Sequence, residues 1–226
     1  MDPRESVMRK RFEGMKKIVV VSSKGGVGKS TLSALLALIL SKRARVGLLD
    51  LDAYNPSIPS VLGMKKLEVG EDKGIKPQPF DGISVLSFAH FIGDRPMPLR
   101  GKELSDAVKE LFSVVVWDVD VLVVDTPPGM GEVTLEIMRL LGDPKFLVIT
   151  TPSLLAEKAL SREMSLLGEA KVLGVVKNMS SGRGEMCIRY SGSLERAYGD
   201  VDKLINSDVA GDMKEVADVI WKRLTA

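Results

Sequence analysis

Residues 18–31 have the sequence IVVVSSKGGVGKST, and this stretch decides how the rest of the chain is interpreted. The run Ile18–Val21 is apolar and β-branched, which is typical of a strand buried on both faces of a parallel sheet. A glycine-rich loop follows at 24–30, and the apolar run LSALLALIL at 32–40 is long enough for a helix. Strand, glycine loop and helix in this order predict a phosphate-binding loop, because glycines let backbone N–H groups converge on an anion at the positive end of the helix.

Nucleotide contacts are therefore expected from the whole loop: Ser23, Lys24, Gly25, Gly26, Val27, Gly28, Lys29, Ser30 and Thr31. Lys29 is expected to bridge β- and γ-phosphate oxygens of a nucleoside triphosphate and to act in catalysis, and the Ser30 hydroxyl is expected to bind Mg²⁺. A dinucleotide-binding GxGxxG motif is the first alternative, but Thr31 stands where its third glycine belongs. A glycine turn without a ligand is the second, and it leaves the Gly-Lys-Ser ending unexplained.

Two further apolar runs end in aspartate. Residues Arg45–Asp50 predict a second strand, and Asp52 follows in a turn-rich segment, at the strand end where open α/β sheets bind ligands. The two carboxylates, Asp50 and Asp52, suit two tasks beside a triphosphate: one is expected to orient the Mg²⁺ shell and the other to position the attacking water. A polar turn at a strand end is the alternative. The run 121–125, VLVVD, has the pattern of a Walker B strand whose aspartate, Asp125, holds Mg²⁺ directly or through water.

Two more residues are candidate contacts. Gly129, in the TPPG segment after Asp125, can bring its N–H close to a γ-phosphate, so loss of that phosphate could be felt in residues 126–133. Asn178 follows the predicted strand Val172–Val176 and could hydrogen-bond a purine edge. Asparagine is also common at strand ends, so both interpretations of Asn178 stay open.

Composition narrows the classes of partner. The chain has 32 basic and 30 acidic residues and a formal net charge of +2, so no global field favours nucleic acid or a membrane surface. No apolar run reaches membrane-spanning length, and no secretory segment is recognisable at the N-terminus. The single cysteine excludes an intramolecular disulfide framework and suits the reducing cytosol, so a cytoplasmic location is expected.

The 226 residues predict a single α/β domain with a doubly wound, mostly parallel sheet and right-handed crossovers. Residues 1–15 are expected to form a short helix in a solvated arm, and residues 180–206 an irregular segment. An exposed excursion is predicted at 64–82 and a proline-broken loop at 94–101. The apolar spacing of Asp208–Leu224 indicates a helix that covers the sheet, and its mixed charges argue against a membrane anchor.

Several segments together resemble one family of ATPases. The loop with its additional lysine, KGGVGKS, is similar to the deviant P-loop of the class that contains MinD, ParA and the nitrogenase iron protein. Over residues 16–181 the chain resembles the Mrp/ApbC-type P-loop ATPases, the iron–sulfur cluster carrier family. The segments that carry this resemblance are SSKGGVGKST at 22–31, GLLDLDAYNPSIPSVLG at 47–63, PLRGKELSDAV at 98–108, WDVDVLVVDTPPGMGE at 117–132, TTPSLLAEKAL at 150–160 and GVVKNMSS at 174–181.

The resemblance implies roles for matching residues. Lys24 would reach across a nucleotide-sandwiched dimer, and Asp52 would orient water, which leaves Asp50 for the Mg²⁺ shell. Asp125 would be the Walker B acid and Asn178 the adenine contact. It implies Mg²⁺-dependent ATP binding and slow hydrolysis in an ATP-dependent homodimer that serves an unidentified client protein. A MinD/ParA-like positioning ATPase and a nucleotide-gated scaffold with little turnover are the alternatives.

The chain departs from the family pattern in two places. Met130-Gly131-Glu132 stands where relatives usually have Thr-Gly-Asp. The Cys-Pro-x-Cys motif that binds the cluster in relatives is absent, and the chain has only Cys187 in that region. Four thiolates normally hold a [4Fe–4S] cluster, and a homodimer of this chain supplies two. A stable cluster in the homodimer is therefore not expected unless small thiols or a partner protein add ligands.

Overall fold

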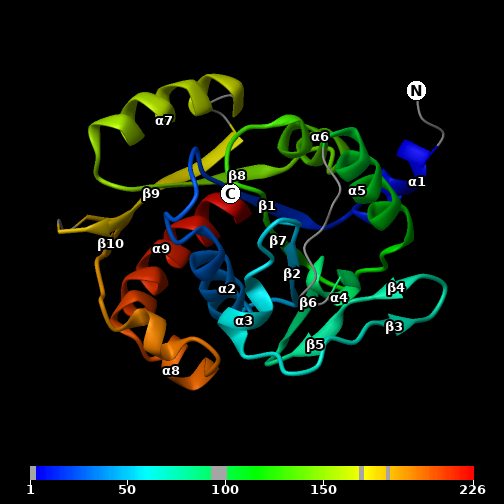
Figure 1. The fold of residues 1–226 in the computed structure, drawn as a ribbon, viewed down its shortest axis with the longest axis horizontal. Coiled ribbons are helices and arrows are strands. Elements are labelled where there is room, and N and C mark those ends of the chain that lie inside the picture. The colour runs from blue at the N-terminus through cyan, green and yellow to red at the C-terminus, as the bar shows by residue number, and fades with distance from the viewer. Residues whose placement is uncertain (1–3, 93–100, 168–170, 182–183) are drawn as a thin grey trace.

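The computed structural model describes residues 4–92, 101–167, 171–181 and 184–226, which form an α/β structure with one large sheet (Figure 1). The strand order in the described part of the sheet is β10-β9-β8-β1-β7-β2-β6-β5. All neighbours are parallel except β5 and β6. In this order, the strands are β10 (Cys187–Arg189), β9 (Val172–Ser180), β8 (Lys145–Thr150), β1 (Lys16–Val21), β7 (Val121–Asp125), β2 (Val46–Asp50), β6 (Ile83–Ser87) and β5 (Gln78–Phe80). The prediction of a doubly wound, mostly parallel sheet is confirmed.

Helices cover both faces of this sheet (Figure 1). One apolar cluster lies between the sheet and α2 (Lys29–Leu40), α3 (Ile58–Leu62), α8 (Val201–Ile205) and α9 (Asp208–Thr225). The other lies between the sheet and α1 (Arg4–Arg11), α5 (Lys102–Val114), α6 (Glu132–Leu140) and α7 (Leu154–Leu167). Because both faces are covered, the central strands are buried throughout, which explains their continuous apolar sequences.

The register of the central strands assembles the site. Val20 of β1 lies beside Asp125 at the end of β7, and Asp125 lies beside Asp50 at the end of β2. Since the three strands are parallel, the residues that follow them emerge at the same edge of the sheet. The glycine loop and both aspartate segments therefore meet, although up to a hundred residues of sequence separate them.

Part of the N-terminal segment packs against the rest of the molecule, where the sequence predicts a solvated arm. Met8 and Phe12, one helical turn apart, are fully buried against α5, where the rings of Phe12 and Phe112 lie 4.8 Å apart. Arg11 Nη1 donates a hydrogen bond to the Val115 carbonyl at 3.1 Å. Burial of the apolar pair at i, i+4 thus stabilises the packed position of this segment although the neighbouring residues are charged, and Met8 and Phe12 join the second apolar cluster.

The described residues of the segment 180–206 contain more regular structure than expected. They contain strand β10, a 3-10 helix at Leu194–Ala197 and helix α8. Ile188 of β10 and Leu204 of α8 are fully buried. The excursion at 64–82 holds the antiparallel pair β3 (Gly70–Glu71) and β4 (Ile75–Lys76) and then the edge strand β5. Helix α4 (Ala89–Ile92) follows β6, and nearly all of the predicted loop at 94–101 lies outside the described residues.

Helix α9 confirms the predicted cover for the sheet. Its apolar residues Met213, Val216 and Ile220 are fully buried in the first cluster, as their helical spacing indicates. Within the described ranges, no helix combines the length and the apolar character that crossing a bilayer requires.

Candidate nucleotide-binding site

The glycine loop has the backbone that its sequence predicts. Gly26 and Gly28 have φ angles of +74° and +82°, in the left-handed region where side chains other than glycine are strained. Gly28 is also the N-cap of α2, so the loop ends at the positive end of that helix. The loop lines a cleft of about 350 Å³ at the carboxyl edge of the sheet, and Asp52, Tyr54, Pro128 and Tyr198 are among the other residues that line it.

Asp125 is the centre of the hydrogen-bond network below this cleft. It is fully buried and accepts hydrogen bonds from Lys29 Nζ at 2.7 Å, Ser30 Oγ at 2.6 Å and Ser33 Oγ at 2.9 Å. Carboxylate and hydroxyl oxygens are ligands that Mg²⁺ prefers, so the donor set fits that cation. Lys29 and Ser30, the two groups expected to bind phosphate and Mg²⁺, are held by the acid from the Walker B strand.

Asp50 lies next to Asp125 but does not line the cleft. It is fully buried, and its carboxyl oxygens accept from the backbone N–H groups of Asp52 (3.1 Å) and Ile58 (3.3 Å) and from Ser87 Oγ (2.9 Å). Burial, and after it the charge of Asp125, raises the pKa of Asp50 to about 8. In this arrangement Asp50 holds the backbone of the following loop in place, and its expected part in the Mg²⁺ shell stays a prediction.

Asp52 is the carboxylate that faces the cleft. Its Oδ1 accepts from the N–H groups of Tyr54 (3.2 Å) and Asn55 (3.1 Å), a turn that fixes the side chain. Within the described part of the chain, Oδ2 has no hydrogen-bond partner. Burial is the main reason why the pKa of Asp52 is raised. One anchored and one open oxygen suit a group that positions water.

Lys24 and Gly129, both expected to contact the nucleotide, differ in position, because Lys24 lines the cleft and Gly129 does not. Lys24 is exposed at the edge of the cleft and forms no ion pair with any described residue. Gly129 has a φ angle of +87°, but its N–H donates to the Ser22 carbonyl at 2.7 Å. The N–H expected to face a γ-phosphate is thus bound to the residue that precedes the glycine loop, and Gly129 connects this loop to the segment after Asp125.

Asn178 supports the loop from below. Its Nδ2 donates to the Val27 carbonyl at 2.8 Å, and the side chain is buried. A Cβ placed on Gly28 would lie 2.5 Å from the same Nδ2, so that position requires glycine for space as well as for φ. Asn178 does not line the cleft, and its contact with a purine remains a prediction.

Sequence reasoning missed several residues of the site, and three of them have side chains that hydrogen-bond to predicted site residues. Tyr198 lines the cleft, and its hydroxyl lies 2.8 Å from Thr31 Oγ1; no local pattern in residues 180–206 indicates this contact. Ser87 holds Asp50 from the neighbouring strand. Ser33 lies one helical turn after Lys29 on α2, so the i, i+4 spacing is a signal that could have identified it.

Comparison with known proteins agrees with this geometry. The family model described as ParA, NUBPL iron-transfer P-loop NTPase, matches residues 14–207. The chain belongs to this family. Curated relatives named iron–sulfur cluster carrier protein are 38% identical over 74% of this chain in Rickettsia felis and 39% identical over 73% in Saccharolobus solfataricus. These matches cover 55% and 58% of the relatives, so this NUBPL-family chain spans little more than half their length.

Solved structures show the same fold. A nucleotide-binding protein from Archaeoglobus fulgidus in complex with ADP is 26% identical, with a TM-score of 0.72 over 89% of this chain and 93% of the other. The cell-division ATPase MinD from Pyrococcus furiosus has a TM-score of 0.65 at 22% identity, over 92% of this chain and 98% of the other. The NUBPL-family chain thus has the P-loop NTPase fold that its motifs predict.

Proposed function

We propose that this chain binds Mg²⁺–ATP at the glycine loop and hydrolyses it slowly as a nucleotide-switched homodimer in the service of iron–sulfur cluster assembly. The observation that carries the proposal is the convergence of Lys29 and Ser30 on Asp125, with the open oxygen of Asp52 facing the cleft above them. A cation, a hydroxyl and two carboxylates at one helix N-terminus are the parts that phosphoryl transfer to water requires.

Each residue then has a distinct task. Lys29 leaves Asp125 to bind phosphate oxygens, while Ser30 and Asp125 offer oxygens to the cation. Mg²⁺ supplies charge neutralisation on the phosphate oxygens when it is bound. Asp52 holds the attacking water through Oδ2, since Oδ1 is fixed by backbone N–H groups. This division predicts that Asp52 matters for turnover and Lys29 for binding.

The dimer part of the proposal is based on Lys24. An exposed cation at the edge of the cleft, without an ion pair in the described ranges, is free to bind the phosphates of a second copy. The mixed charges on the polar face of α9 favour this function over a membrane- or DNA-bound positioning ATPase.

The cluster itself is proposed as a substrate that the homodimer does not hold alone. Cys187 is the one cysteine of the chain, and the described residues contain no group of three or more histidine, cysteine or acidic side chains placed to hold a metal. Two thiolates per homodimer leave a [4Fe–4S] cluster two ligands short. A partner protein or small thiols must supply the others.

The substitution Asp52→Asn tests the proposal. ATP affinity should stay within about threefold of the wild type, while single-turnover phosphate release slows by roughly 100-fold or more, the contribution typical of positioned acid–base groups. Asp72→Asn, at an exposed acid paired with Lys76, is the matched control and should change neither. Equal losses of affinity and rate would assign Asp52 to the metal site or to folding. Undetectable turnover in the wild type would favour the scaffold alternative.

A further inference from the structure

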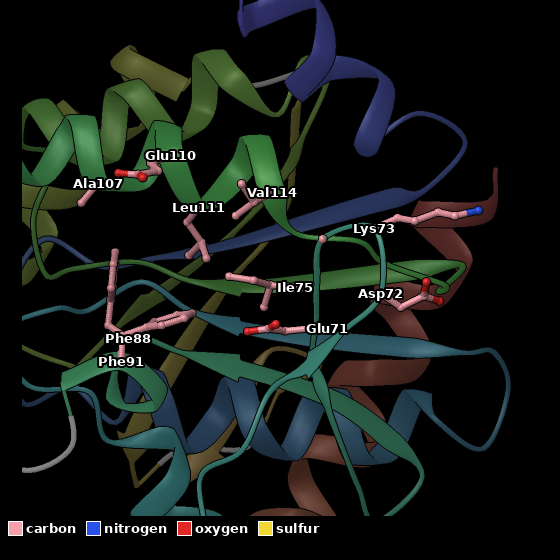
Figure 2. A pocket seen from close by; sticks show the side chains of 11 residues that line it. Glu71, Asp72, Lys73, Ile75, Phe88, Phe91, Ala107, Glu110, Leu111 and Val114 are labelled. Atoms are coloured by element: carbon pink, nitrogen blue, oxygen red, sulfur yellow. The ribbon is translucent and has the colours of Figure 1, made fainter.

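A second cavity shares no lining residue with the nucleotide cleft. Figure 2 shows the side chains that line this second cavity. Its volume is about 710 Å³, twice that of the cleft. The β3–β4 hairpin, the start of α4 and one side of α5 surround it. The apolar lining consists of Ile75, Phe88, Phe91, Ala107, Leu111 and Val114.

The cavity combines a buried floor with an exposed aromatic ring. Phe88 and Leu111 are almost fully buried, whereas Phe91 is 45% exposed. Complete burial of a phenylalanine side chain is worth about 1.5–3 kcal/mol, so an aromatic ring left in water beside an apolar hollow favours an occupant. A buried apolar centre with exposed residues around it is also the anatomy of protein interfaces.

The charges at the rim that face the apolar residues are negative. Glu71 reaches from β3 toward Phe88, and Glu110 lies beside Ala107 on α5 (Figure 2). Neither carboxylate has an ion pair or a hydrogen bond within the described part of the chain. Asp72 and Lys73 point away from the cavity in the same view, and Asp72 is paired with Lys76 at 2.6 Å. An occupant with positive charges would therefore complement the rim.

We propose that this cavity docks a basic amphipathic segment of a partner protein, whose apolar side chains fill the hollow over Phe91 while lysine or arginine side chains meet Glu71 and Glu110. A protein segment fits better than an enclosed small ligand, because small-molecule sites bury most of their ligand and this mouth is bounded by exposed residues. Aromatic anchors surrounded by charged rims are the usual centres of such contacts.

The position of the cavity gives the docked partner access to the nucleotide machinery. The Phe88 N–H donates to the Asp50 carbonyl at 3.2 Å, and the preceding residue, Ser87, donates its hydroxyl to the Asp50 carboxyl group. The partner would thus contact the end of β6, which is hydrogen-bonded to Asp50 at the end of β2. The docking proposal itself does not depend on ATP binding, so the two proposals fail separately.

The test measures fluorescence anisotropy with the full chain and two labelled helical peptides of equal length, one built of leucine and lysine, the other of leucine and glutamate. The lysine peptide should bind, and the glutamate peptide should not. Phe91→Ala should weaken binding by roughly tenfold or more, as expected for an aromatic anchor. The double variant Glu71→Lys, Glu110→Lys should also lose binding.

The matched control is Glu195→Lys with Glu215→Lys, which changes the net charge equally at exposed acids outside the cavity. It should bind the lysine peptide as the wild type does. The proposal is overturned if both double variants lose binding equally, if neither does, or if the two peptides bind alike. Circular dichroism melting of each variant distinguishes loss of binding from loss of fold. If a charge variant does not fold, Phe91→Ala still tests the proposal, because the Phe91 ring is exposed and its removal should not disturb the fold.

Discussion

The ion pair between Lys29 and Asp125 allows the most quantitative prediction. Its Nζ–Oδ1 distance is 2.7 Å, and the two side chains are 7% and 0% exposed. The substitution Lys29→Met keeps the length of the side chain and removes its charge. Among the described residues, this leaves the buried carboxylate of Asp125 with the Ser30 and Ser33 hydroxyls as its side-chain partners. Removing one partner of a buried pair costs about 3–5 kcal/mol.

For a chain of this length, each kcal/mol corresponds to roughly 2–4 °C in Tm, so the expected decrease is about 6–20 °C. The assay is urea unfolding of the nucleotide-free protein, with the free energy of unfolding compared at an unchanged m value. Asp125→Asn alone should also destabilise the protein. The double variant should cost less than the sum of the two single changes, because the partner that each change leaves unpaired is then gone.

Lys76→Met is the control for burial. Lys76 and Asp72 form an ion pair of similar length, 2.6 Å, but both side chains are more than half exposed. Exposed pairs contribute about 0–1 kcal/mol, so this variant should be nearly as stable as the wild type. The stabilising role of the Lys29–Asp125 ion pair is refuted if Lys29→Met lowers the free energy of unfolding no more than Lys76→Met does. It is also refuted if the losses of free energy from the Lys29 and Asp125 changes are additive.

Three further predictions concern Lys24, Tyr198 and Cys187. Lys24→Ala should reduce ATP-dependent dimerisation and hydrolysis more than monomer binding of ADP; sedimentation with a non-hydrolysable analogue that gives equal dimer for variant and wild type would contradict this. Tyr198→Phe removes the hydroxyl at Thr31 and should lower the free energy of unfolding by about 0.5–1.5 kcal/mol in urea, and an unchanged value would count against that hydrogen bond. Anaerobic reconstitution with iron and sulfide should leave the desalted homodimer without a stable [4Fe–4S] cluster; four irons per dimer, lost in Cys187→Ala, would show otherwise.

The sequence predicted those parts of the fold that depend on local periodicity and on the glycine loop. The strand Val121–Asp125 and the loop at 24–30 were recognisable because each requires its residue types in that order. The burial of Met8 and Phe12 was not predicted, because two apolar residues in a highly charged segment become buried only when α5 is present to pack against them. Tertiary contacts of this kind leave no periodic signal in a short helix.

The candidate site likewise contains residues that their motifs predicted and others that only the structure reveals. The roles expected for Lys29 and Asp125 come from their motifs, and the structure brings the two side chains together. The residue pattern alone does not distinguish the two aspartates of the second strand end, Asp50 and Asp52, and only the resemblance assigned Asp52 to water. The fold determines that Asp50 is fully buried and that Asp52 faces the cleft. Tyr198 enters the cleft from a segment whose path depends on α3 and α8, and therefore only the structure reveals it.

The central claim is that the glycine loop binds Mg²⁺–ATP, and isothermal titration calorimetry tests it most directly. Mg²⁺–ATP is titrated into the full chain and into Lys29→Ala under identical conditions, with the folding of both confirmed beforehand. The account predicts saturable binding of one nucleotide per chain for the wild type and loss of tight binding for the variant. Equal affinity of the two proteins, or no binding by the wild type, would contradict it.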